Sequence, residues 1–246
     1  MLEIACDESG YEGEKLIGST TRLFAHASVS LAEPAAVLAE LRVRIRSPAT
    51  EYKANHLLRP QHRRTLRWFL GESGPVYGRG HVFLLDKPAF VRRVFDEHVG
   101  GEFPGPESAN DILRTKAEPD LDVLRPTARH RAAAFREWLS ADPVGRSVLD
   151  PLVPAIVAAV THWGPVTIAH DRQTQLPPRR VEVLKERCPL RDIRFLEALR
   201  HPEIQIADIL AGTVRALTEA GDPELIHLLP PYTDAGSRST GEVGPE

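Results

Sequence analysis

Short apolar runs alternate along the chain with longer stretches of helical spacing. Two runs near the start, residues 2–6 and 23–31, have the length and partial alternation of β-strands. The connection between them is long and contains glycine, which predicts a hairpin. Residues 80–85, 166–169 and 193–196 are predicted to form further strands.

Between these strands, apolar residues recur every three or four positions, as on the buried face of a helix. Helices are predicted over residues 35–45, 60–70, 88–99, 129–139, 149–163, 180–187 and 204–220. Because helices and strands alternate, we expect an α/β or α+β class with a mixed β-sheet flanked by helices.

No linker divides the chain, so residues 1–229 are predicted to form a single domain. A loop rich in glycine and proline begins at residue 100 and is followed by a charged segment, which predicts a helical insertion over about residues 100–150. Residues 230–246 are rich in Gly, Pro, Ser and Thr and are predicted to be a disordered tail.

Composition excludes several classes of protein. The chain has 246 residues, 42% of them hydrophobic and 26% charged, which is ordinary for a soluble protein. A net charge of −3 argues against coating nucleic acid by bulk charge, and two cysteines are too few for a disulfide scaffold. Neither a signal peptide nor a membrane-spanning run is recognised, so a cytoplasmic location with reduced thiols is expected.

Four carboxylates stand out by position. Asp7 and Asp171 each follow a predicted strand, Asp208 interrupts an apolar helix, and Glu51 lies between two basic helices. Taken singly, Asp7 and Asp171 have the bland interpretation of turn or cap residues, and Asp208 that of an exposed stripe. If they converge, their repulsion is relieved by a hard divalent cation, and an all-carboxylate set suits Mg²⁺ or Mn²⁺.

The same residues carry a resemblance to a known family. The start IACDESG, the Glu-x-Lys pair of Glu51 and Lys53, the acid Asp171 and the helix sequence IQIADILAG resemble the domain-of-unknown-function 3800 family. The resemblance runs from Asp7 to Arg215.

That family is regarded as ribonuclease H-like, so the resemblance implies a ribonuclease H-like sheet. By its motifs, Asp7, Glu51, Asp171 and Asp208 are candidate metal ligands that hold two divalent ions. Lys53 joins them as a candidate catalytic residue that contacts a scissile phosphate or orients a water.

Basic residues gather around Glu51. Residues 42–67 carry a net charge of +7, so the rest of the chain carries −10. Arginine suits phosphate oxygens, and Tyr52 and Trp68 are candidates for stacking on bases, although a solvated helix face is the common meaning of such a run. The candidate substrate-binding residues are Arg59, Arg63, Arg64 and Arg172.

The leading functional hypothesis is a metal-dependent nuclease with Mg²⁺ or Mn²⁺ as cofactor and nucleic acid as partner. One alternative is an inactive module that binds nucleic acid or protein, as in phage defence; another is a hydrolase of a small phosphorylated molecule. A homodimer or a partner protein is compatible with either, and no membrane partner is expected. Scattered acids, or acids blocked by a salt bridge to Lys53, would favour the binding module.

Overall fold

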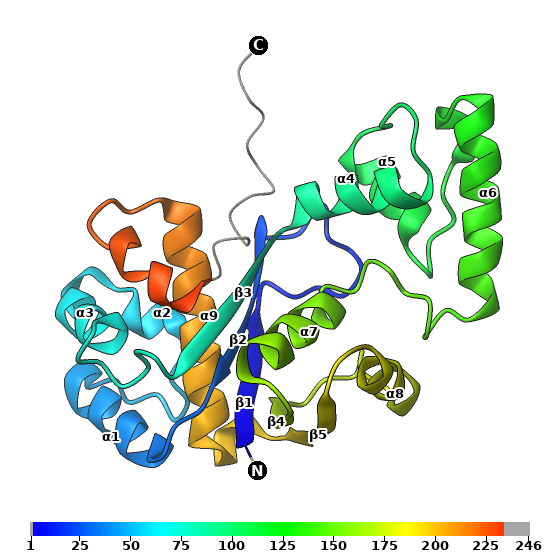
Figure 1. The fold of residues 1–246 in the computed structure, drawn as a ribbon. Helices are drawn as coiled ribbons and strands as arrows, with labels where there is room; N and C mark the ends of the chain where they lie inside the picture. The colour runs from blue at the N-terminus through cyan, green and yellow to red at the C-terminus, as the bar shows by residue number, and fades with distance from the viewer. Residues whose placement is uncertain (1, 234–246) are drawn as a thin grey trace.

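A computed structural model describes residues 2–233. Its centre is a five-stranded sheet in the order β3-β2-β1-β4-β5. The strands are β1 (Leu2–Ser9), β2 (Leu23–Val29), β3 (Gly80–Asp86), β4 (Val166–Asp171) and β5 (Leu190–Leu196). β2 is antiparallel to both β1 and β3, whereas β4 is parallel to both β1 and β5. The sheet is therefore mixed, as the sequence predicts (Figure 1).

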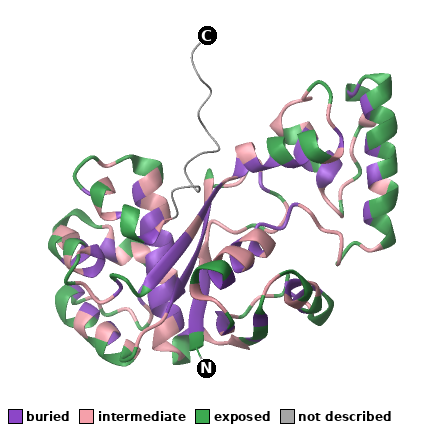
Figure 2. Cartoon of the chain, viewed as in Figure 1, coloured by how far each residue is buried: buried purple, intermediate pink, exposed green. Residues whose placement is uncertain are grey.

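Both faces of the sheet are covered by helices. Alternate residues of β1 face opposite ways, so Ile4 and Cys6 join one hydrophobic cluster and Ala5 joins the other. The first cluster packs under α4 (Lys87–His98), α5 (Pro106–Leu113), α6 (Pro126–Ala141), α7 (Leu152–Trp163) and α8 (Pro178–Arg187). The second packs under α1 (Pro34–Ile45), α2 (Ala54–Leu57), α3 (Arg63–Leu70) and α9 (Pro202–Ala220). Strands β2 and β3 are accordingly buried over most of their length, whereas β5 at the edge of the sheet is only partly buried (Figure 2).

The predicted insertion is helical. Residues 100–150 contain α5 and α6, which extend with α4 away from the sheet in Figure 1. Their inward faces carry Ala109, Ile112, Ala132 and Phe135, which join the first hydrophobic cluster. The insertion is thus packed onto the domain.

The disordered tail predicted for residues 230–246 starts too early in the chain, because its first residues are folded onto the domain. Residues 230–232 form a short 3-10 helix, and the Tyr232 hydroxyl donates a hydrogen bond of 2.7 Å to the carbonyl of Leu70. Tyr232 is buried against α3 and β3, because an aromatic ring with a satisfied hydroxyl gains from leaving water. Residue 233 is also described, and the remainder of the predicted tail, residues 234–246, lies outside the described residues.

Across residues 2–233, none of the helices combines the length and the apolar character needed to span a bilayer.

Candidate acidic site at the ends of the central strands

Two acids come together because β1 and β4 are parallel neighbours. Cys6 pairs with His170 in the ladder, so Asp7 and Asp171 occupy the next position of each strand. The carboxyl ends of parallel strands are where open α/β sheets bind their ligands. The structure therefore brings the two acids to adjacent strands; Asp171 ends β4 as predicted, whereas β1 continues past Asp7 to Ser9.

Asp208 reaches the same place from α9. This helix packs across β1 and β2 with an almost wholly apolar inner face, which includes Ala207 and Leu210. Burial raises the pKa of Asp208, the ammonium of Lys53 opposes that rise, and the charges of Glu51 and Asp171 add to it. Asp208 is therefore close enough to Glu51 and Asp171 for their charges to change its pKa. The three predicted acids come from a helix, a connecting segment and the end of a strand.

Lys53 is the counter-ion of this cluster. Its Nζ lies 2.8 Å from Oε1 of Glu51 and 3.0 Å from Oδ2 of Asp208. Burial acts to lower the pKa of Lys53, but the hydrogen bond to Glu51 and the charge of Asp208 outweigh it and raise that pKa. Lys53 is therefore charged at neutral pH. Its contact with two acids is the salt bridge that counts against a preformed metal site.

Asp7 is the most buried acid of the cluster, with 5% of its surface exposed. Burial raises its pKa to about 9, and the charges of Glu8, Asp208 and Asp171 act in the same direction. Only one hydrogen bond opposes this, from the backbone N–H of Glu8 to Oδ1 at 2.7 Å. In the absence of a cation, Asp7 is accordingly protonated at neutral pH.

Glu8 belongs to the site although sequence reasoning passed over it. Burial raises its pKa to about 7, with further contributions from the charges of Asp171 and Asp208. Its Oε1 accepts a 2.7 Å hydrogen bond from Gln173, while its buried Oε2 has no hydrogen-bond partner. The available signal is its place next to Asp7 in the sequence DESG, although the alternation of a β-strand sends adjacent side chains to opposite faces.

Two buried histidines hold the end of β4. The carbonyl of Asp171 accepts a 2.9 Å hydrogen bond from Nδ1 of His170, which leaves Nε2 of His170 to accept from Nε2 of His26 at 3.2 Å. Burial lowers the pKa of both rings, so both are neutral. The Asp171 side chain is fixed separately, because its Oδ1 accepts from the N–H of Ala198 at 3.0 Å.

The chemistry of the donor set fits Mg²⁺ or Mn²⁺. The Oε2 of Glu8 has no hydrogen-bond partner, and burial raises the pKa of Asp7, Glu8 and Asp208, with the charge of Asp171 adding to each rise. These features are typical of a site that lacks positive charge. The ligand shell is not preassembled: among residues 2–233, no three His, Cys, Asp or Glu side chains stand together in ion-binding geometry. An ion would therefore have to draw these carboxylates inward and displace Lys53.

Gly212 sets the distance between α2 and α9. A Cβ on this residue would lie 2.6 Å from the Cβ of Ala54, the residue after Lys53. We expect Gly212→Ala to push α2 outward and to lower the free energy of unfolding by about 1–3 kcal/mol, because inserting a methyl group into a close-packed contact strains it. Urea unfolding of Gly212→Ala, and of Gly212→Ala with Ala54→Gly as the matched control that restores room, measures the effect. Equal stability of Gly212→Ala and the parent would contradict this account.

The predicted substrate arginines divide into two kinds. Arg63 lies 2.9 Å from Asp222 and 3.1 Å from Glu224, and Arg172 lies 2.9 Å from Glu197. By contrast, Arg59 and Arg64 are exposed and make no ion pair within residues 2–233. The basic run is thus partly neutralised by acids that are distant in sequence, and Arg59 and Arg64 are its more available phosphate contacts.

The two aromatic residues proposed to stack on bases are both engaged. Tyr52 is buried, its hydroxyl donates to the carbonyl of Ser47 at 2.8 Å, and the prediction for it is wrong. The folded chain uses its ring to close the loop before α2. Trp68 is half-buried, and the guanidinium of Arg44 lies 4.2 Å from the centre of its ring.

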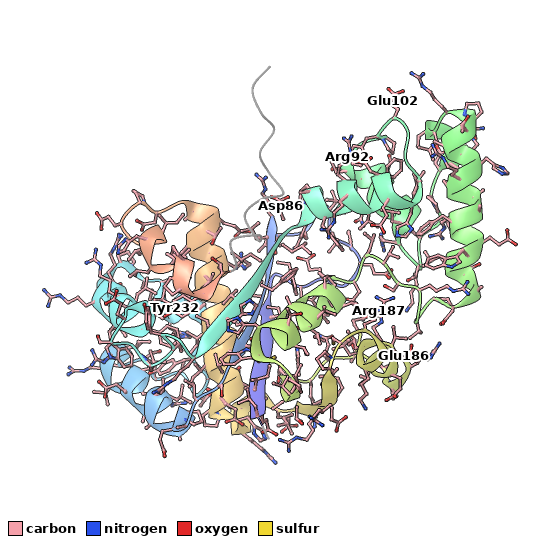
Figure 3. All side chains as sticks on the ribbon, viewed as in Figure 1. Asp86, Arg92, Glu102, Glu186, Arg187 and Tyr232 are labelled. Atoms are coloured by element: carbon pink, nitrogen blue, oxygen red, sulfur yellow. The ribbon has the colours of Figure 1, made fainter. Side chains whose placement is uncertain are left out.

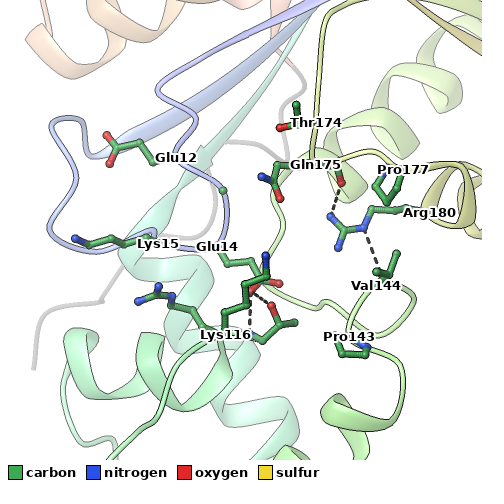
Figure 4. A pocket seen from close by; sticks show the side chains of 13 residues that line it. Glu12, Glu14, Lys15, Lys116, Pro143, Val144, Thr174, Gln175, Pro177 and Arg180 are labelled. Carbon is green, nitrogen blue, oxygen red and sulfur yellow. Dashed lines mark hydrogen bonds between the residues drawn. The ribbon is translucent and has the colours of Figure 1, made fainter.

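A pocket of about 370 Å³ lies between residues 12–15, 114–116, 143–144 and 174–180 (Figure 4). None of the acids of the site lines it, although Thr174 of its lining follows the Gln173 that binds Glu8. Arg180 closes one wall by donating hydrogen bonds to the carbonyls of Gln175 and Val144. The other charged residues of the lining are of both signs: Glu12, Glu14, Lys15, Arg114 and Lys116.

The chain matches no protein-family model and no curated protein. Among solved structures, it is similar to a chain of the PCNA:RNase HII complex from Archaeoglobus fulgidus. The sequence identity is 14%, the TM-score is 0.44, and the match covers 92% of this chain and 78% of that chain. The fold class is established by the sheet itself: a mixed five-stranded α/β sheet flanked by helices, as predicted.

Proposed function

We propose that this protein is a divalent-metal-dependent phosphodiesterase that hydrolyses nucleic acid. One observation carries the proposal: Asp7, Glu8 and Asp208 are buried or largely buried, burial raises the pKa of each, and the charge of Asp171 adds to each rise. Burying charge is costly, and strongly perturbed groups clustered at a ligand-binding edge mark functional sites. A purely structural role would be better served by apolar residues.

The candidate metal ligands remain Asp7, Glu51, Asp171 and Asp208, and Glu8 joins them. A bound Mg²⁺ or Mn²⁺ supplies Lewis-acid polarisation of a phosphate and activation of water. The groups of the chain itself hold the ligands in place and contact the substrate. The Ala198 amide and the His26–His170 pair keep Asp171 and its strand end in place. Lys53, once released from Asp208, is a cation of the site that can contact an incoming phosphate.

The same arrangement supports membership of the domain-of-unknown-function 3800 family and a ribonuclease H-like fold. The acids that the motifs single out come from the first strand, the late strand and the last long helix, and these elements adjoin one another. Exposed Arg59 and Arg64, which follow α2, favour a polyanionic substrate over a small one.

The test is cleavage of labelled single-stranded and double-stranded DNA and RNA in EDTA, Mg²⁺ or Mn²⁺. We expect cleavage only with metal, and none with Asp208→Asn, while Asp96→Asn on the exposed face of α4 retains the parental rate. A nucleotide and p-nitrophenyl phosphate, tested alongside, report on the small-substrate alternative.

Metal binding is measured separately by thermal unfolding. At 100 times its dissociation constant an ion stabilises by about 2.7 kcal/mol, which for a chain of this size raises Tm by about 5–10 °C. We expect this rise with Mn²⁺ in the parent and its loss in Asp208→Asn.

The non-catalytic binding module also has an observation in its favour, the ion pairs of Lys53 with Glu51 and Asp208. These contacts give the acids a permanent counter-ion that needs no metal. Nucleic-acid binding that is unaffected by EDTA, with no cleavage and no rise of Tm in Mn²⁺, would establish this alternative and reject the nuclease.

A further inference from the structure

A groove separates the helical insertion from the body of the domain. It has a volume of about 790 Å³ and lies between α4, α6, α7 and the end of α8. Phe90 and Val94 of α4 and Val153 and Val157 of α7 supply an apolar floor. Its size is within the range of sites that bury a small organic group.

One wall of the groove is an exposed aromatic ring. Trp138 of α6 keeps 40% of its surface exposed, which is unusual for so large an apolar side chain. His98 lies 6.2 Å away with its ring nearly parallel, at 20°, so two planar groups line the same wall. A flat aromatic surface open to solvent is suited to stacking on another ring.

The rim of the groove is cationic. Its charged lining residues are Arg93, Arg146 and Arg187, against the single acid Glu97. Arg146 lies over Trp138, with its guanidinium carbon 5.2 Å from the ring centre. Arg93 and Arg187 are exposed and make no ion pair within the described part of the chain, and Figure 3 shows Arg187 between α7 and α6. These guanidinium groups are therefore available to an anion.

We propose that this groove binds unpaired nucleotides of a single-stranded nucleic acid. A base stacked on Trp138 fills the apolar floor, and the flanking phosphates meet Arg93 and Arg187. A single strand is favoured over a duplex because the faces of paired bases are covered by their neighbours in the stack. The charge of the rim favours this occupant over an uncharged apolar peptide. The proposal rests on the proposed function for its substrate class and assigns that substrate a site outside the acid cluster.

The experiment is fluorescence anisotropy with fluorescein-labelled oligothymidylate and with a blunt DNA duplex, both in EDTA so that nothing is cleaved. We expect the single strand to bind at least about tenfold more tightly than the duplex. Trp138→Ala should weaken single-strand binding by about tenfold, the loss of one stacked base. Arg187→Glu should weaken it by a similar factor and reduce the salt dependence.

Arg191→Glu is the matched control, because Arg191 is exposed on β5 outside the groove and the change in net charge is the same. It should bind within about twofold of the parent. Asp7→Asn should also bind the single strand, which separates this site from the acid cluster. If the parent binds the single strand but cleaves nothing in Mg²⁺ or Mn²⁺, the nuclease is rejected and the groove is kept.

Parental affinity in Trp138→Ala, or equal affinity for duplex and single strand, overturns the proposal. Circular dichroism of Trp138→Ala checks that the variant is folded. An acidic aromatic peptide that displaces the oligonucleotide at equal concentration would instead assign the groove to a protein partner.

Discussion

Asp7→Asn is expected to abolish metal-dependent cleavage. Asp7 lies at the centre of the acid cluster, where its pKa is raised by burial and by Glu8, Asp208 and Asp171. Asparagine keeps the shape but removes the negative charge that a cation needs. A positioned metal contributes several kcal/mol to transition-state stabilisation, and ~1.36 kcal/mol is a factor of ten, so the rate should fall by about 10³-fold or more. Initial cleavage rates in Mg²⁺ measure this.

The same substitution should change the pH dependence of stability. The pKa of Asp7 is raised in the folded state, so its favourable contribution is complete below the unfolded pKa of about 3.9 and is lost as pH rises towards about 9. In EDTA the parental Tm should therefore decline over this interval. Asp7→Asn, which cannot ionise, should decline less and be the more stable protein at pH 9.

Asp96→Asn is the control for both measurements, because Asp96 is exposed and contacts only Arg92 through a 2.8 Å ion pair. Cleavage by Asp7→Asn at the parental rate would remove Asp7 from the site. Parallel pH profiles of the parent and Asp7→Asn would mean that Asp7 is not the group that titrates.

Asp150→Ala is expected to cause the largest loss of stability. Asp150 is 2% exposed and forms a buried ion pair with Arg180 of α8, itself 8% exposed. It also accepts hydrogen bonds from the Tyr11 hydroxyl at 3.1 Å and from the N–H of Leu152 at 3.0 Å. One carboxylate therefore joins the β1–β2 connection, the start of α7 and α8.

Alanine leaves the Arg180 guanidinium buried without its counter-ion. Breaking one half of a buried pair typically costs 3–5 kcal/mol, and we expect about that decrease in the free energy of unfolding, measured by urea denaturation. Asp150→Ala combined with Arg180→Met removes both charges and should recover part of the loss. If the double variant is as unstable as the sum of the two single variants, the ion pair is not the cause.

Much of the fold could be predicted from the local periodicity of the apolar residues. Every predicted strand is present. Most extend beyond the prediction, as with β4, predicted at 166–169 and found at Val166–Asp171, whereas β2, predicted at 23–31, ends at Val29. The ends were harder to place because a strand stops where its ladder partner stops, which is a long-range property. The short α2 and α5 were not predicted: α2 is held against α9 through Gly212, and the Asn110 side chain of α5 binds the backbone of residues 14–17.

The site was predictable in part. Asp7 and Asp171 follow short apolar runs, and Asp208 interrupts an apolar helix, so hydrophobic patterning alone marked them as unusual. Glu8 escaped notice because the orientation of a side chain at a strand end depends on its neighbours, here Gln173. The predicted substrate arginines show the opposite error. Arg63 pairs with Asp222 and Glu224, which are remote in sequence, and Arg172 pairs with Glu197, so acids neutralise both.

The amino-acid sequence by itself determined the alternation of strands and helices that defines the class, the helical insertion, and the acids that follow the apolar runs of β1 and β4, because these depend on residues adjacent in the chain. Only the tertiary structure decided that Lys53 binds Glu51 and Asp208, that Tyr52 is buried and that Trp138 faces a cationic groove. Ion pairing and burial depend on which distant segments meet, and that is settled by the packing of helices on the two faces of the sheet.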